Sequence, residues 1–185
     1  MNSAMLDIET LGTGSDSAVI SVGLVAFSED AGIIASTGWA IRPEDWHGHI
    51  DPKTVKWWMS QNEAAQHFSF GGVTQDYFVA QAIASFVHIH KIEEVWANDP
   101  DFDVVILKNW WSRVAATHTV AAGFWPFKYN QSRSFRTITA EAKRLGINYD
   151  HIYDHKTVAH NPIDDAANQA RVVNWIRAHL VKAER

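Results

Sequence analysis

Two carboxylates stand one residue apart in an apolar stretch near the N-terminus. Asp7 and Glu9 alternate with Leu6 and Ile8 in the run MLDIETLG at positions 5–12. Side chains alternate between the two faces of a β-strand, so both acids project from one face. Neighbouring carboxylates repel each other, and oxygen ligands of this kind bind Mg²⁺ or Mn²⁺. The pair therefore indicates a divalent metal site, although two solvated acids at an exposed strand end have the same pattern.

Two helix starts farther along the chain share one plan. In ANDPDFD at 97–103 and in HNPIDD at 160–165, an Asn or Asp precedes a proline, and an aspartate follows that proline by three residues. Proline suits the first helical position, where no backbone N–H is needed. Asp103 and Asp165 therefore fall in the first turn of a helix, where the helix dipole favours an anion. Each aspartate taken singly has that ordinary structural explanation.

Together and in this order, the candidate residues indicate a functional site more strongly than any one of them does singly. An acid pair on the first strand is followed by an acid opening a central helix and an acid opening the last helix. His160 precedes Asp165 by five residues, and an imidazole is suited to proton transfer near neutral pH. Asp101 and Asp164 are neighbouring acids, but the spacing of three from proline favours Asp103 and Asp165. The set predicts a metal centre with a general base.

In order, these residues resemble the three motifs of the DEDD exonucleases, in the branch with a histidine before the last aspartate (DEDDh, DnaQ-like 3′-5′ exonucleases). The Trp57-Trp58 pair and the segments 96–98 and 133–137 are similar to a subgroup that contains phage exodeoxyribonuclease VIII and a mycobacterial exoribonuclease. The resemblance implies an RNase H-like fold. It also implies phosphodiester hydrolysis that depends on two divalent ions, Mg²⁺ or Mn²⁺.

The resemblance also implies a role for each motif residue. One ion would be held by Asp7, Glu9 and Asp165, and the other by Asp7 with water and the substrate phosphate. Asp103 would complete the metal site through bound water, and His160 would take a proton from the attacking water. The residues just after the first acid pair would contact the 3′ end of the substrate, and these are Thr10 and Leu11.

A basic and aromatic segment is the candidate surface for a nucleic-acid strand. Among its cations, Arg136 is the candidate substrate-binding residue. Stacking of a base on one of its aromatic rings would contribute about 1–3 kcal/mol. Trp58 is a further substrate-binding candidate, with burial in the core as the alternative. The alternative for the segment is that its rings are core and its cations a solvated helix face. Its members are Trp125, Phe127, Lys128, Tyr129, Arg133, Phe135, Arg136, Lys143 and Arg144, with Glu141 as the one acid between the cations.

The rest of the chain predicts the elements that position these residues. Branched apolar runs at 18–27 and 33–41 follow the first strand after short turns, which predicts an antiparallel meander. Asp51 and Pro52 begin a helix over 52–61. The other predictions are helices over 74–91 (with Phe78, Ala82, Phe86 and Ile89 at helical spacing), 100–111, 134–145 and 162–183, a strand over 94–97, and no element over 119–130.

Composition excludes several classes of protein. The 185 residues are 46% hydrophobic with nine Trp and nine Phe, which is ample for one packed domain. The absence of cysteine excludes disulfides and thiolate chemistry and fits a cytoplasmic location. We expect neither a membrane span nor a secretory signal. The net charge of -5 argues against binding nucleic acid by bulk charge, so a local basic patch is required.

The sequence therefore predicts a single exonuclease domain over 1–185 with an α/β fold, antiparallel in its first three strands, then parallel, and flanked by helices. The expected reaction is 3′-5′ hydrolysis of single-stranded nucleic acid, with DNA favoured, to nucleoside 5′-monophosphates. The expected partners are single-stranded DNA or RNA 3′ ends and no membrane, and a homodimer stays open. An exoribonuclease on the same scaffold, an inactive nucleic-acid-binding module and a structural protein with scattered acids also stay open.

Overall fold

The computed structural model describes residues 1–118 and 124–183. Within these residues five strands form one sheet in the order β3-β2-β1-β4-β5. Strand β2 is antiparallel to both of its neighbours, β1 and β3, whereas β4 is parallel to β1 and β5 is parallel to β4. The predicted mixed sheet is therefore confirmed. The strands are β1 (Asn2–Thr10), β2 (Val19–Ser28), β3 (Gly32–Ala40), β4 (Ile92–Ala97) and β5 (Ser132–Ser134).

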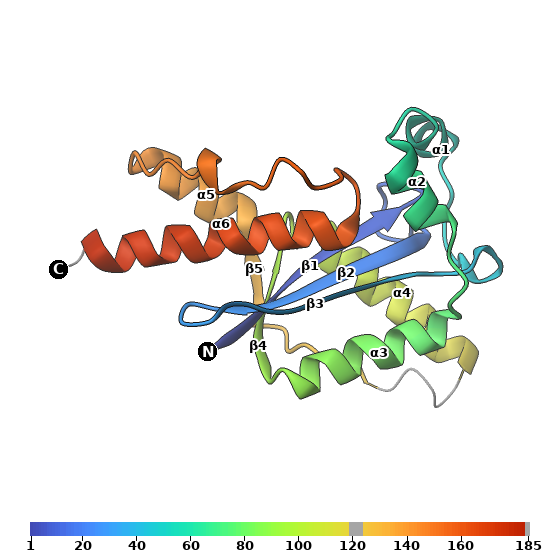
Figure 1. The fold of residues 1–185 in the computed structure, drawn as a ribbon. Helices are drawn as coiled ribbons and strands as arrows, with labels where there is room; N and C mark the ends of the chain where they lie inside the picture. The colour runs from blue at the N-terminus through green and yellow to red at the C-terminus, as the bar shows by residue number, and fades with distance from the viewer. Residues whose placement is uncertain (119–123, 184–185) are drawn as a thin grey trace.

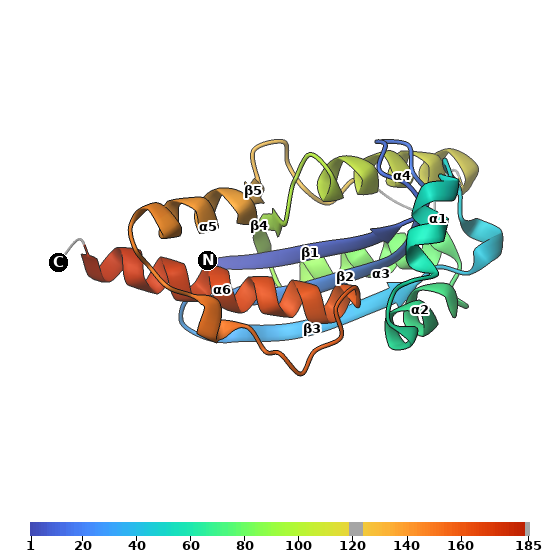
Figure 2. The same ribbon diagram turned by 90° about the horizontal axis from the view of Figure 1, so that it is seen from above.

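Helices cover both faces of the sheet. Figure 1 shows α5 and α6 on one face, α3 and α4 on the other, and α1 and α2 beyond the end of β1. Figure 2 shows α6 lying along the sheet, close to the direction of its strands. No helix among the described residues is both long and apolar enough to cross a bilayer. The helices are η1 (Pro43–Asp45), α1 (Pro52–Trp58), α2 (Glu63–Phe70), α3 (Asp76–Ile89), α4 (Asp103–His118), α5 (Phe135–Arg144), η2 (Asp150–Ile152) and α6 (Pro162–Ala183).

Three details differ from the sequence predictions. Helix α2 and strand β5 were not expected, because α2 buries only small side chains and β5 has three residues. The face expected for α3 was wrong at Phe78 and Ile89, which are exposed. Phe86 is buried as expected, but Val79 and Ile83 are buried with it, so the apolar face is rotated from the expected one. Of the segment 119–130, for which no element was expected, residues 119–123 lie outside the described residues.

The alternation of β1 divides the core in two. Leu6 and Ile8 point toward α3 and α4, in the cluster that contains the fully buried Trp110. Met5 points the other way and packs in the cluster that contains Val173 of α6. The strand period of two therefore directs the acids at positions 7 and 9 to the face opposite Leu6 and Ile8, as the sequence predicted, and α6 packs on that face.

Two glycines let α6 begin close to the sheet. Gly23 of β2 pairs with Asp7 of β1 and with Gly38 of β3. A Cβ atom at Gly23 would overlap the carbonyl group of Pro162, and one at Gly38 would overlap the side chain of Ile163. The start of α6 therefore rests on bare backbone next to Asp7, which brings the first turn of the helix to the acid pair.

We expect Gly23→Ala to lower the free energy of unfolding by about 1–3 kcal/mol, because the new methyl group meets backbone that has little freedom to move. Gly38→Ala should cost less, since the nearest group it meets is the side chain of Ile163 rather than backbone. Urea unfolding of both variants measures the difference. Equal stability of Gly23→Ala and the unmodified protein would contradict the close approach of α6.

Candidate active site

One cavity of about 420 Å³ collects all five motif residues. Strand β1 supplies Asp7 and Glu9, α4 supplies Asp103, and the start of α6 supplies Asp165 with His160 just before it. Ligand atoms of Glu9, His160 and Asp165 all lie within 4.8 Å of one another. We call this space the acid cavity.

Local hydrogen bonds hold the two helix-start aspartates in place. Asp103 accepts a bond from the backbone N–H of Asp99 at 3.2 Å. Asp165 accepts one from the backbone N–H of His160 at 2.8 Å, so the acid and the histidine are tied together. The neighbouring Asp164 instead accepts from the N–H of Val158 at 2.9 Å. Neither Asp101 nor Asp164 is among the residues that line the acid cavity.

His160 has an unusual backbone and an aromatic neighbour. Its φ of 64° lies in the left-handed region, which is uncommon for any residue except glycine. Its ring meets that of Trp57 edge to face, with 4.8 Å between the ring centroids. Trp57 is in turn packed at 5.2 Å against Trp58. The conformation of the loop and the pair of indoles together determine where the imidazole lies.

Burial and mutual repulsion raise the pKa values of these acids. Burial raises the pKa of Glu9 to about 9, and the nearby Asp165 and Asp103 add to the shift. Burial raises the pKa of Asp103 to about 6. The pKa of Asp7 is raised well above its usual value by burial and by the other acids, and that of Asp165 is raised mainly by burial. Such a set favours a cation, and its oxygen ligands fit Mg²⁺ or Mn²⁺.

Gln169 is a site residue that the sequence reasoning missed. Its Nε2 donates to Oδ1 of Asp7 at 3.3 Å, and this bond opposes the rise in the pKa of Asp7. Its Oε1 is buried and has no hydrogen-bond partner. Gln169 follows Asp165 by four residues, and that helical spacing places both on one face of α6. The sequence therefore contained a signal that could have identified Gln169 as a site residue.

Two more cavities adjoin the acid cavity. The first, of about 410 Å³, shares Ile8, Glu9 and Phe102 with it and is lined by Trp57. The second, of about 400 Å³, shares Asn98, Asp165 and Gln169 with it and is lined by Tyr153. We call them the Trp57 cavity and the Tyr153 cavity. The acid cavity lies between them, so the three form a continuous series.

The four residues expected at the substrate are placed differently. Thr10 lines the Trp57 cavity, and Arg136 lines the acid cavity. Leu11 is 2% exposed and packs in the core with Trp58, which is 1% exposed. The indole N–H of Trp58 donates to the carbonyl oxygen of Thr10 at 2.9 Å. Direct contact of the Trp58 ring with a substrate does not fit this burial, and its neighbour Trp57 is the exposed member of the pair.

Several side chains of the basic and aromatic segment pack in the core or form ion pairs within the protein. Phe127 and Phe135 are buried, so the prediction that they stack on bases does not fit the structure, whereas Tyr129 is exposed. The side chain of Arg133 is bound to Glu94 at 2.9 Å, and that of Arg144 is bound to Glu141 at 2.8 Å. Core packing and local ion pairs therefore account for much of this segment.

The sheet topology, with four acids and a histidine in one cavity, is the arrangement that the resemblance to DEDDh exonucleases implied. Among solved structures, E. coli exonuclease I in complex with a 5cy-dA13 oligonucleotide matches with a TM-score of 0.66 and 13% identity over 96% of this chain. This chain spans 40% of that exonuclease I chain. The nuclease domain of 3′hExo, a DEDDh family member bound to rAMP, matches with a TM-score of 0.61 and 10% identity over 96% of this chain and 92% of that one.

Further comparisons identify the family. The Mg²⁺- and Mn²⁺-bound form of S. pombe Pop2p has a TM-score of 0.56 and 14% identity over 97% of this chain and 84% of that one. No curated relative matches the chain. Residues 2–177 match the model of the 3′-5′ exoribonuclease Rv2179c-like domain, and the chain belongs to that family. The DEDDh resemblance is therefore confirmed.

Without metal, we expect the free energy of unfolding to fall as the pH rises from about 5 to about 9. Glu9 has a pKa of about 9 in the folded state against a usual value of 4.5, so between these values only the folded protein keeps the proton. Urea unfolding in EDTA measures this slope, which should be smaller in Glu9→Gln. Mg²⁺ should stabilise the unmodified protein at pH 8 by more than it stabilises the variant.

If the free energy of unfolding depended on pH in the same way in the unmodified protein and in Glu9→Gln, the raised pKa of Glu9 would be contradicted. Glu93→Gln is the matched control, because Glu93 is an exposed acid on β4 and its removal should leave the slope unchanged.

Proposed function

We propose that the protein is a metal-dependent 3′-5′ exonuclease that hydrolyses single-stranded nucleic acid and releases nucleoside 5′-monophosphates. The observation that carries this proposal is the convergence of Asp7, Glu9, Asp103 and Asp165 with His160 in one cavity. Four acids without a neutralising cation would destabilise the fold, so the arrangement is explained by metal binding. Residues 1–185 would act as one exonuclease domain.

The four acids would hold two divalent ions, Mg²⁺ or Mn²⁺. Ions held there would lower the pKa of an attacking water molecule and neutralise the charge on the leaving 3′-oxygen. The protein contributes the positions of the oxygen ligands: Asp7 is held by Gln169, Asp103 by the N–H of Asp99, and Asp165 by the N–H of His160. These bonds fix the carboxylates before substrate arrives, which reduces the reorganisation that the reaction requires.

His160 is the proposed general base. It lines the acid cavity together with Glu9 and Asp165, within reach of a water molecule in the same space. Its imidazole would take a proton from the attacking water and release it to solvent. The indole of Trp57 packs against the ring, so Trp57 limits the orientations of the imidazole.

The series of cavities gives a path for the strand. The terminal nucleotide would occupy the Trp57 cavity, where an indole that is 42% exposed offers a stacking surface. The scissile phosphate would lie in the acid cavity beside Arg136, whose Nη1 is 3.6 Å from Oδ2 of Asp99 and whose side chain is largely exposed. The preceding nucleotide would enter the Tyr153 cavity. Each cavity has the volume of a small-molecule site.

The sugar preference is a separate question. The sequence favoured DNA, whereas the family is described by its exoribonuclease activity, which favours RNA as the second candidate substrate. A ribose is distinguished from a deoxyribose by contacts to its 2′-hydroxyl. Both polymers therefore belong in the test of function.

The test is digestion of 5′-labelled single-stranded DNA and RNA with Mg²⁺, Mn²⁺ or EDTA. We expect a ladder that shortens from the 3′ end with release of mononucleotides, and no cleavage in EDTA or by Asp165→Asn. His160→Ala should turn over about 10²–10⁴-fold more slowly, because it loses the general base, and should still bind metal and oligonucleotide.

His88→Ala is the matched control, because His88 is an exposed histidine on α3, away from the cavity. Metal-independent cleavage, cleavage from the 5′ end, or no cleavage of either polymer would refute the proposal. Normal turnover by His160→Ala would remove His160 as the base.

The two neighbouring tryptophans should behave in opposite ways. Trp57→Ala should raise KM for an oligonucleotide by roughly tenfold, because a stacking surface worth about 1–3 kcal/mol is lost, with little change in stability. Trp58→Ala should lower the free energy of unfolding by about 3–5 kcal/mol, since it empties a buried site. Steady-state kinetics and urea unfolding separate the two effects, and the reverse pattern would contradict the assignment of Trp57.

A further inference from the structure

A second group of metal-ligating side chains lies outside the acid cavity. Asp76, the first residue of α3, has a side chain with no exposed surface. Nε2 of His118, at the end of α4, lies 3.1 Å from its Oδ1, and Nε2 of His47 lies 3.7 Å from its Oδ2. Two imidazoles from distant parts of the chain therefore converge on one buried carboxylate.

The two carboxylate oxygens are not equally satisfied. Oδ1 of Asp76 accepts a 2.6 Å bond from the backbone N–H of Tyr77 and also lies near His118. Oδ2 is buried and has no hydrogen-bond partner, because 3.7 Å is too long for a bond from His47. An unpaired oxygen on a buried carboxylate is costly, so this group requires a partner that the hydrogen bonds do not supply.

The neighbouring charges do not supply that partner. Asp45 is a second carboxylate, and its Oδ2 accepts the backbone N–H of Asp76 at 3.2 Å. Arg42 is bound to Asp45, through Nε at 2.7 Å, rather than to Asp76. The two histidines are therefore the nearest groups that can act on Asp76.

We propose that His47, Asp76 and His118 form a binding site for a first-row transition-metal ion such as Zn²⁺. Two imidazoles and one carboxylate are a common set of three protein ligands for zinc, with water in the fourth position. Bonds of about 2.0–2.1 Å place ligand atoms of a tetrahedral site roughly 3.3–3.4 Å apart, and the two Nε2 atoms lie 3.1 and 3.7 Å from opposite oxygens of Asp76. Imidazole also selects Zn²⁺ over Mg²⁺, which the acid cavity prefers.

Binding requires the two imidazoles to move toward each other. They approach different oxygens, and the three residues do not bring one ligand atom each within 4.8 Å of the others, as Glu9, His160 and Asp165 do. The side chains of His47 and His118 are 41% and 33% exposed, so both have room to rotate. The ring of Tyr77 packs at 5.0 Å against that of His118 and restrains it on one side.

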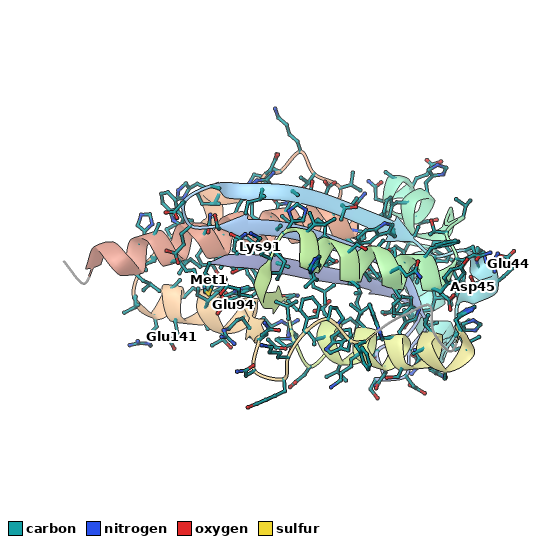
Figure 3. All side chains as sticks on the ribbon, turned by 90° about the horizontal axis from the view of Figure 1, so that it is seen from below. Met1, Glu44, Asp45, Lys91, Glu94 and Glu141 are labelled. Carbon is teal, nitrogen blue, oxygen red and sulfur yellow. The ribbon has the colours of Figure 1, made fainter. Side chains whose placement is uncertain are left out.

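The proposed site is separate from the catalytic centre. Asp103 and His118 are at opposite ends of α4, which corresponds to about 22 Å along the helix. Figure 3 shows Asp45 at the end of the molecule where α3 begins and α4 ends. A metal ion there would join the loop after η1 to α3 and α4, and would stabilise the packing of these two helices.

The test uses the full chain with Asp7→Asn and Asp165→Asn, which removes metal binding in the acid cavity. We expect this parent protein to bind one equivalent of Co²⁺ with the visible absorption of a tetrahedral site, and Zn²⁺ to displace it. His47→Ala and His118→Ala should each weaken binding at least about tenfold. Zn²⁺ should raise the Tm of the parent by more than it raises that of His118→Ala.

His88→Ala in the same parent is the matched control and should bind Co²⁺ normally. Asp76→Asn removes a buried group and is expected to impair folding, so the decision rests on the two histidine variants, whose fold is checked by circular dichroism. Absence of Co²⁺ binding in the parent, or unchanged binding in both histidine variants, would overturn the proposal. Either result would leave the proposed exonuclease activity untouched.

Discussion

Repulsion among four carboxylates is the constraint on which the architecture of this protein depends. Isolated acids stay in water, yet here Asp7, Glu9, Asp103 and Asp165 are gathered from three elements into one cavity, and burial raises their pKa values. The surrounding fold must supply enough stability to hold them together. It does so with an apolar core on each side of β1 and with helix starts whose backbone N–H groups face the acids.

The elements that position the site were largely predictable from the sequence. Alternation along β1 placed both acids on one face, and proline with an aspartate three residues later marked the starts of α4 and α6. These patterns are local, and local geometry determines them. The order of strands across the sheet and the approach of α6 to Gly23 depend instead on contacts between distant residues, which periodicity does not encode.

The side chains at the substrate surface were predicted less well for the same reason. Trp57 and Trp58 are adjacent in sequence and identical in type, and only the direction of α1 decides which is buried. Phe127 and Phe135 lie among cations in the sequence, as base-stacking rings often do. In the structure each is buried in one of the two core clusters on either side of the sheet. Gln169 was overlooked although its helical spacing from Asp165 was legible.

The bond between Trp58 and Thr10 has a consequence for the length of each catalytic step. The end of β1 is tied to α1 by that indole N–H and to Asp51 by a 2.7 Å bond from its backbone N–H to the carbonyl oxygen of Leu11. The two walls of the Trp57 cavity are thus joined at a fixed separation. In the proposed reaction a cavity of fixed size holds one terminal nucleotide. The phosphodiester bond that follows this nucleotide then lies at the acids, whatever the base.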